Sequence, residues 1–256
     1  MRTSKPLIEV RFLAGAMNIN VIYEDDDIVA INKPSGLLVH PVLESSRGDT
    51  VQSSPTLVNW LLEKYPEIKL VGDDPSIRPG IVHRLDKDTS GVLVAAKNQK
   101  SFDFLKSQFQ NRQVVKKYIA LVHGKVKNKE GVINFPIGAS KHDFRKKSSI
   151  GKLRGKIREA VTEYKVIEEF PDYTILEISP QTGRTHQIRV HLKSIGHPIA
   201  GDKLYGQKKE TNHLNLERQF LHAKSIDIML PSGGKIRLEA DLPDDLKEAL
   251  LKLQKA

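Results

Sequence analysis

The chain of 256 residues contains no cysteine. This absence excludes disulfide bridges, zinc sites built on thiolates and a cysteine nucleophile. No run of eighteen apolar residues occurs, so we expect no membrane-spanning helix. Residues 1–5 are polar and basic, and no apolar signal segment follows them. We therefore expect a protein that is not secreted and that works in the cytoplasm.

Common nucleotide and metal signatures are also missing. The chain has no glycine-rich loop of the G-x-x-x-x-G-K-[ST] kind and no dinucleotide fingerprint after a strand. His83 and Asp86 are three residues apart, and His186 and His191 are five apart. Neither spacing matches a helical histidine pair with a partner acid. We therefore expect no metal and no cofactor, which argues against a metal-dependent nuclease.

Positive charge is what the chain has in excess. Lysine and arginine number 41 against 31 acidic residues, which gives a net charge of +10. A basic surface favours a polyanionic partner such as nucleic acid, although charge that only keeps the protein soluble is the alternative. The segment 141–158, here called the basic segment, contains eight of these cations and two glycines. This composition indicates a mobile loop that contacts phosphates. Its cations are Lys141, Arg145, Lys146, Lys147, Lys152, Arg154, Lys156 and Arg158.

Short apolar runs joined by turn residues predict a fold rich in hairpins, with helices placed between them. Hairpins are predicted at 21–31, 161–178 and 226–239, and a single strand at 118–122. Helices are predicted around 57–61, 102–109, 188–195 and 246–253. Because strands and helices do not alternate regularly, we expect an α+β fold with a mixed, mostly antiparallel sheet. Residues 1–18 form a predicted N-terminal arm and residues 19–256 a single domain.

The segment His83-Arg84-Leu85-Asp86-Lys87-Asp88-Thr89-Ser90-Gly91 stands directly before an apolar run at 92–96. Polar groups at the edge of a buried strand are rigidly supported and well placed for chemistry. Asp86 could simply cap a turn or pair with Arg84 or Lys87. The neighbouring cations would, however, keep its carboxylate ionised, which suits a nucleophile or a general base. We therefore take Asp86 as the candidate catalytic residue.

A second motif at 182–192 predicts a helix with Thr185 as its N-cap and Gly196 as its C-terminal stop. This places Arg189 in the first or second turn. An arginine there can hold a carboxylate in two-pronged geometry. The alternatives are a solvated helix face or a helix start that binds phosphate.

Tyr118 follows two lysines at the start of the predicted strand at 118–122. A tyrosine on a strand usually belongs to the core and has its hydroxyl hydrogen-bonded. The two lysines indicate a wet neighbourhood that attracts anions. In such surroundings Tyr118 could instead move protons or stack on a base.

These motifs together resemble the RluA family of RNA pseudouridine synthases. The segments that carry the resemblance are 31–41, 80–97, 116–124, 182–206 and 218–223. The similarity runs from about residue 19 to residue 245, in the order that the family has. It implies a catalytic core with a largely antiparallel sheet around a central RNA cleft. It also implies the isomerisation of uridine to pseudouridine without metal or cofactor.

The resemblance assigns roles to individual residues. It implies that Asp86 is the catalytic aspartate, Tyr118 the active-site tyrosine and Arg189 the arginine that pairs with the aspartate. Arg84 would enter the RNA where the target uridine has left the stack. Apolar walls would keep the detached uracil from water. The expected wall residues are Leu85, Ile188, Val190 and Leu221. Further RNA contacts are expected from Lys33, His83, Arg184, His186, Lys146 and Lys147.

Two alternatives follow from the same residues. Many members of the family carry an S4-like RNA-binding domain before the core, and here the core begins near residue 19. We therefore expect a monomeric enzyme that recognises a local RNA shape, in either ribosomal or transfer RNA. The competing interpretation is a non-catalytic RNA-binding or ribosome-assembly module on the same scaffold. The joint presence of Asp86, Tyr118 and Arg189 favours the enzyme.

Overall fold

The computed structural model describes residues 18–41, 55–141, 143, 146–150, 153–206 and 214–255. Residues 1–17 of the predicted arm lie outside this part, as do Arg145 and Lys152 of the basic segment. Among the described residues, no helix is both long and apolar enough to cross a membrane.

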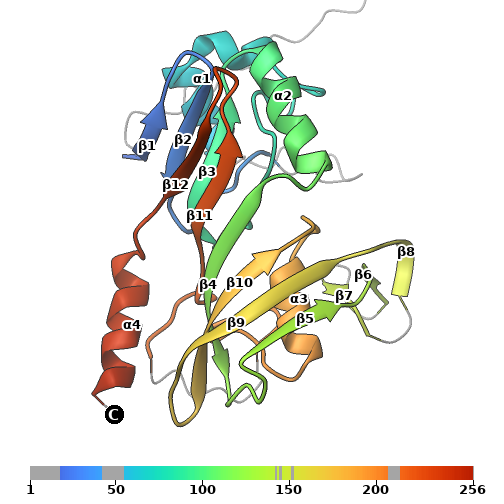
Figure 1. The fold of residues 1–256 in the computed structure, drawn as a ribbon, viewed down its shortest axis with the longest axis vertical. Coiled ribbons are helices and arrows are strands. Elements are labelled where there is room, and N and C mark those ends of the chain that lie inside the picture. The colour runs from blue at the N-terminus through green and yellow to red at the C-terminus, as the bar shows by residue number, and fades with distance from the viewer. Residues whose placement is uncertain are drawn as a thin grey trace, which may run out of the picture.

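A nine-stranded sheet runs through the molecule in the order β1-β2-β3-β11-β4-β10-β9-β5, and β12 pairs with β11 (Figure 1). Its strands are β1 Asn20–Glu24, β2 Ile28–Lys33, β3 Ser90–Ala96, β4 Val115–His123, β5 Glu130–Asn134, β9 Val161–Glu169, β10 Tyr173–Pro180, β11 Leu221–Met229 and β12 Lys235–Glu239. A smaller sheet has the order β7-β6-β8, with β6 Ile137–Ser140, β7 Lys147–Ser148 and β8 Leu153–Arg158. Among the strand pairs of the described residues, only β3 and β11 run parallel. The prediction of a mixed, mostly antiparallel sheet and of three hairpins is confirmed.

Four α-helices of the described part cover the large sheet, and all four were predicted. They are α1 Leu57–Lys64, α2 Gln99–Gln110, α3 Gln187–Ser194 and α4 Asp244–Gln254. Helices α1 and α2 pack with β1, β2, β3 and β12 in a first core. Helices α3 and α4 pack with β9, β10 and the end of β4 in a second core. Figure 1 shows the two cores one above the other, with β4 and β11 passing between them.

Two local predictions are wrong. The N-cap of α3 is His186, in a left-handed conformation with φ 57°, and not Thr185. The side chain of Gln187 causes this, because its Oε1 atom accepts the N–H of Arg184 and the hydroxyl of Thr182 and so closes a turn before the helix. The basic segment is also not simply a loop, since β7 and β8 both pair with β6. Backbone pairing in a small sheet does not require the apolar pattern by which strands are recognised.

Gly91 is the point where the backbones of β3 and β11 come closest together. Its φ of +114° lies in the left-handed region, and a Cβ atom there would overlap the carbonyl oxygen of Ala223 on β11. Only glycine allows this approach at this φ. The parallel pairing of β3 with β11 involves only Ser90 and Gly91 on the β3 side. The motif that carries Asp86 therefore ends at the crossing of β3 and β11.

His222 on β11 lies fully buried beside this crossing. Its Nδ1 atom lies 2.9 Å from the hydroxyl of Ser90, and its Nε2 atom lies 3.1 Å from the carbonyl of Ala240. Because a carbonyl only accepts, Nε2 carries the proton and Nδ1 accepts from Ser90. Burial lowers the pKa of His222 to about 4, so the ring is neutral at pH 7.

We predict that His222→Gln weakens the acid sensitivity of the fold. The unfolded chain protonates this histidine near pH 6.5, whereas the folded chain does so only near pH 4. The unfolded state therefore binds more protons in this window, and His222 lowers the free energy of unfolding as pH falls from about 6.5 towards 4. A glutamine keeps one acceptor for Ser90 and one donor for Ala240 but does not titrate.

Urea unfolding at about pH 4.5 and about pH 7.5 tests this prediction. The loss of stability between the two pH values should be smaller in His222→Gln than in the parent protein. Equal losses would show that His222 does not titrate between these pH values.

Candidate active site

A cavity of about 680 Å³ lies where the two cores meet. The loop before β3 and the end of α2 form one wall, the loop between β10 and α3 forms the other, and β4 contributes side chains between them. Its lining contains seven cationic side chains and a single carboxylate, that of Asp86. The cations are Arg78, Arg84, Arg112, Lys116, Arg158, Arg184 and Arg189. The seven cations make this cavity attractive to anions.

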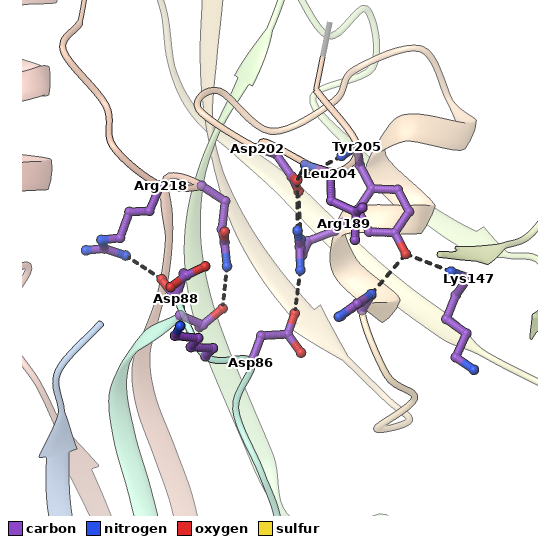
Figure 2. Close-up of polar contacts among 12 residues, drawn as sticks. Asp86, Asp88, Lys147, Arg189, Asp202, Leu204, Tyr205 and Arg218 are labelled. Carbon is purple, nitrogen blue, oxygen red and sulfur yellow. Dashed lines mark hydrogen bonds and ion pairs between the residues drawn. The ribbon is translucent and has the colours of Figure 1, made fainter. Parts of the chain in front are cut away.

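Asp86 lies in the loop that enters β3, and buried side chains hold this loop from behind. Lys33 donates to the carbonyl of Lys87 over 2.9 Å. Arg218 donates to the carbonyl of Asp88 over 3.0 Å (Figure 2). Gln219 reaches the hydroxyl of Thr89 at 3.3 Å. The backbone beneath Asp86 is therefore fixed, and the direction of its side chain with it.

Arg189 on α3 joins two carboxylates (Figure 2). Its Nη1 atom donates to Oδ2 of Asp86 over 3.1 Å. Its Nε and Nη2 atoms donate to the two oxygens of Asp202 over 2.7 and 2.8 Å. The predicted contact between Arg189 and Asp86 is present, but the two-pronged geometry is made with Asp202 instead. One guanidinium between two carboxylates leaves one negative charge in excess.

The excess charge belongs to Asp86. The side chain of Asp202 is fully buried, and its Oδ1 atom also accepts the N–H groups of Leu204 and Tyr205. Burial alone would raise the pKa of Asp202, but the hydrogen bonds and charge of Arg189 lower it below the usual value. Asp202 is thus a fixed anion with its acceptors in use. Within the described part of the chain, Oδ1 of Asp86 accepts no hydrogen bond, and the side chain is 17% exposed.

Tyr205 forms a platform under this ion pair. The guanidinium carbon of Arg189 lies 5.0 Å from the centre of the Tyr205 ring, within the range of a cation–π contact. The Tyr205 oxygen accepts the backbone N–H of Lys147 over 2.8 Å and lies 2.9 Å from Nδ1 of His186. Burial lowers the pKa of His186, which favours the neutral ring that accepts the Tyr205 hydroxyl. The platform therefore connects Arg189 to the small sheet at β7.

Tyr118 on β4 lies between the two cores and packs against both. It lines the same cavity as Asp86. Burial and, to a lesser extent, the charge of Asp86 raise the pKa of Tyr118 well above its ordinary value. The hydroxyl is therefore protonated at neutral pH.

Two of the predicted contact residues are wrong, because they do not face the cavity. Lys33 is fully buried and donates its three protons to the carbonyls of Pro34, Leu37 and Lys87. Burial lowers its pKa to about 7, and its role is to hold the loop of Asp86. Val190 belongs to a separate small cluster with Tyr205. Two residues along a helix turn by roughly 200°, which places Val190 opposite Ile188.

His83, also predicted as an RNA contact, lines the cavity as part of its wall. Its Nε2 atom accepts the backbone N–H of Val94 over 2.9 Å, and its ring stacks on Phe109 with centres 4.8 Å apart. Burial lowers the pKa of His83 to about 3. The ring is therefore a neutral part of the cavity wall and not a cation for phosphate.

Six of the remaining predicted residues line the cavity, whereas Lys147 lines a second, smaller cavity and Lys146 lines neither; the six are Arg84, Leu85, Arg184, His186, Ile188 and Leu221. Leu85, Ile188 and Leu221 are buried and supply an apolar part of the wall. Arg84 is exposed, with its Nη1 atom 3.3 Å from Nε2 of His40. Arg184 donates its Nε proton to the carbonyl of Glu159 over 3.0 Å. The described residues hold no group of three His, Asp or Glu side chains suited to a metal ion.

Asp202, Tyr205 and Arg218 are the residues of this site that sequence reasoning did not single out. The first two lie in the segment 182–206, whose overall similarity was noticed without a role for either. No local pattern marks a buried carboxylate thirteen residues after the arginine it binds. Arg218 holds Asp88 from a segment that is far away in the chain.

Comparisons with known proteins agree with one another. Residues 27–194 match the family model described as RNA pseudouridylate synthase. An uncharacterised RNA pseudouridine synthase of Bacillus subtilis is 41% identical over 244 residues, which is 95% of this chain and 75% of that protein. Ribosomal large subunit pseudouridine synthase D of Borreliella burgdorferi is 47% identical over 189 residues, which is 74% of this chain and 55% of that protein.

Two solved human structures have a similar fold. Human RNA pseudouridylate synthase domain containing 1 superposes with a TM-score of 0.69 at 25% identity, over 88% of this chain and 84% of its own. Human RNA pseudouridylate synthase domain containing 4 gives a TM-score of 0.68 at 27% identity, over 92% of this chain and 93% of its own.

We predict that Asp202→Asn destabilises the protein far more than Asp86→Asn. Removing the charge of Asp202 leaves buried Arg189 without its two-pronged partner, which should cost about 3 kcal/mol of unfolding free energy. Asp86 contributes one partly exposed hydrogen bond, so its loss should cost no more than about 1 kcal/mol. Urea unfolding of both variants checks the order. A larger loss for Asp86→Asn would contradict the view that Asp202 anchors Arg189.

Proposed function

The chain belongs to the RNA pseudouridylate synthase family, and we propose that it converts uridines of a structured RNA to pseudouridine with Asp86 as the catalytic carboxylate. The observation that carries this proposal is the free Oδ1 atom of Asp86. It belongs to the single acidic side chain of a cationic cavity, and Arg189 fixes the other oxygen. A held, ionised carboxylate beside an apolar wall is suited to act on an uncharged base and its ribose.

The reaction moves the uracil without adding or removing an atom. The bond between N1 and the ribose carbon C1′ breaks, and a new bond forms between C5 and C1′. N1 gains a proton and C5 loses one. The target nucleotide must first leave the RNA stack to bring its glycosidic bond to Asp86. The free oxygen of Asp86 then serves as a nucleophile, at the base or the ribose, or as a base that takes a ribose proton.

The other residues of the cavity have separate proposed roles. Arg189 holds the orientation of Asp86 through the hydrogen bond from its Nη1 atom. Tyr118 supplies a ring against which the uracil stacks. Its hydroxyl is proposed to give its proton to N1 of the detached uracil and, as the phenolate, to take the proton that C5 loses. Leu85, Ile188 and Leu221 keep water from the detached base.

The RNA backbone is proposed to follow the cations from the first cavity to a second. This second cavity, of about 360 Å³, is lined by Lys147, Arg154 and Lys156 and shares Arg158 and Arg184 with the first. Lys146 lies beside it in the chain. Exposed Arg84 is proposed to fill the place that the uridine leaves, and His186 to lie at the rim.

The proposed substrate is large-subunit ribosomal RNA, because named relatives are synthases of that class. Transfer RNA is the alternative, to be separated by mapping pseudouridine in both RNAs from cells with and without the gene. We further propose that the protein acts as a monomer in the cytoplasm, with residues 19–256 as one catalytic domain.

Asp86→Ala is expected to abolish pseudouridine formation, because it removes the carboxylate. Arg189→Ala is expected to reduce the activity at least about 100-fold, because it removes the group that holds this carboxylate. Pseudouridine in ribosomal RNA from a strain without the gene is measured after incubation with each variant. Asp88→Asn is the matched control, since only the main-chain carbonyl of Asp88 is hydrogen-bonded in the described structure. Wild-type turnover by Asp86→Ala would overturn the proposed function.

A triple variant, Lys147→Gln, Arg154→Gln and Lys156→Gln, is expected to bind RNA with a flatter salt dependence. Each lost phosphate contact reduces the slope of log K against log salt by about 0.7 on single-stranded RNA. The control removes the same charge at exposed positions between β4 and β5, with Lys125→Gln, Lys127→Gln and Lys129→Gln. Equal slopes in the two variants would remove the second cavity from the RNA path.

A further inference from the structure

Lys116 is a half-buried cation without a partner. It lies two residues before Tyr118 on β4, and both side chains line the same cavity. Its neighbour Lys117 points to the other face of the strand and pairs with Glu177 over 2.7 Å. In the part of the chain that the structure describes, no acceptor lies within hydrogen-bonding distance of the Lys116 ammonium group and no carboxylate forms an ion pair with it. Lys116 therefore faces the site as a free donor.

Three buried cations of the described residues all have partners, in contrast to half-buried Lys116. Lys33 has three carbonyl partners, Arg189 pairs with Asp202 and Asp86, and Arg218 pairs with Asp245. Removing a charge from water costs free energy unless a partner compensates. For Lys116 burial lowers the pKa to about 8, which reflects this uncompensated cost. An anion from outside the chain would compensate it.

Arg112 lines the same cavity as Lys116, and its presence also indicates an anionic ligand. It follows α2 in the left-handed region, with φ 58°, where glycine is the usual residue. A non-glycine residue there costs about 1 kcal/mol. The backbone N–H of Arg112 donates to the carbonyl of Phe109. The ring of Phe109 stacks on His83, which lies near Lys116. Arg112 also has no carboxylate partner in the described chain, so two unpaired cations border one part of the cavity.

The spacing along β4 suits a neighbouring nucleotide. Two residues on a strand span roughly 6.7 Å, about the length of one nucleotide unit. Tyr118 and Asp86 hold the end of the cavity proposed for the uridine. Lys116 lies one such step away, on the side of α2 and opposite to the second cavity.

We propose that Lys116 and Arg112 form a subsite for one backbone phosphate of the RNA strand, directly beside the target uridine. This subsite rests on the proposed function, because Asp86 and Tyr118 must hold the uridine for the spacing to apply. A phosphate accepts from both an ammonium and a guanidinium group, and no carboxylate other than Asp86 lines the cavity to repel it.

The test measures binding apart from turnover. In an Asp86→Asn background, the Kd for a transcript of large-subunit ribosomal RNA is measured over a range of salt concentrations. Lys116→Gln should lower the salt slope by about 0.7 to 0.9, and Lys116→Arg should restore it. Lys117→Gln is the matched control and should keep the parental slope. An unchanged slope in Lys116→Gln, or an equal drop in Lys117→Gln, would overturn the subsite.

Lys116→Met, which keeps the apolar stem, repeats the measurement if circular dichroism shows that Lys116→Gln is unfolded. A second arm uses a short hairpin that contains the mapped uridine with a neutral methylphosphonate beside it. This linkage should weaken binding to the Asp86→Asn protein about tenfold and should cost clearly less in the Lys116→Gln variant, in which only Arg112 is left to contact the phosphate. Additive losses would mean that Lys116 contacts another group, such as a uracil carbonyl.

The two proposals fail in different ways. If the parent protein forms no pseudouridine in the transcript, the proposed activity on this RNA is wrong, whereas the salt slope still reports on Lys116. If pseudouridine forms but the slope does not respond to Lys116→Gln, the enzyme stands and the phosphate subsite is rejected.

Discussion

The site depends on one guanidinium group that is shared unequally between two carboxylates. Arg189 gives two hydrogen bonds to Asp202 and one to Asp86. The carboxylate of Asp202 is buried and fully hydrogen-bonded, so it neutralises Arg189. The carboxylate of Asp86 keeps one oxygen without a hydrogen bond in the described part of the chain. A simple two-pronged pair of Arg189 and Asp86 would instead occupy both oxygens of the carboxylate for which we propose a catalytic role. Asp202 therefore allows a stable ion pair with Arg189 to exist beside the free oxygen of Asp86.

This arrangement requires both cores to be in place. Asp86 comes from the loop that enters β3 in the first core, and Arg189 and Asp202 belong to the second core. Gly91 allows β3 to approach β11, and Lys33, Arg218 and Gln219 hold the loop that carries Asp86. Much of the polar chemistry near the site is therefore structural. Buried cations that resemble RNA contacts in the sequence are committed to backbone carbonyls.

Sequence reasoning succeeded where the signal is local and failed where it is not. Hairpins and helices carry their own periodicity, so these elements were predicted, and family motifs brought Asp86, Tyr118 and Arg189 to one cavity. Lys33 was mistaken for an RNA contact because a lysine before a proline gives no sign of the carbonyls that surround it. Val190 was placed on the wrong side of α3, and Asp202 was missed, because burial and partner choice depend on segments far apart in the chain.

The rims of the first cavity carry two residues in a backbone conformation that favours glycine. Arg112 follows α2, and His186 precedes α3 on the facing wall, with φ 58° and 57°. Glycine at either position would relieve local strain of about 1 kcal/mol. A screen for heat-resistant variants would therefore favour glycine at these two positions and so remove two side chains from the cavity wall. At Arg112 and at His186 the residue type that best suits the backbone φ is glycine, whereas a side chain that can contact a ligand requires another residue. Thermal stability and ligand contact therefore favour different residues at both positions.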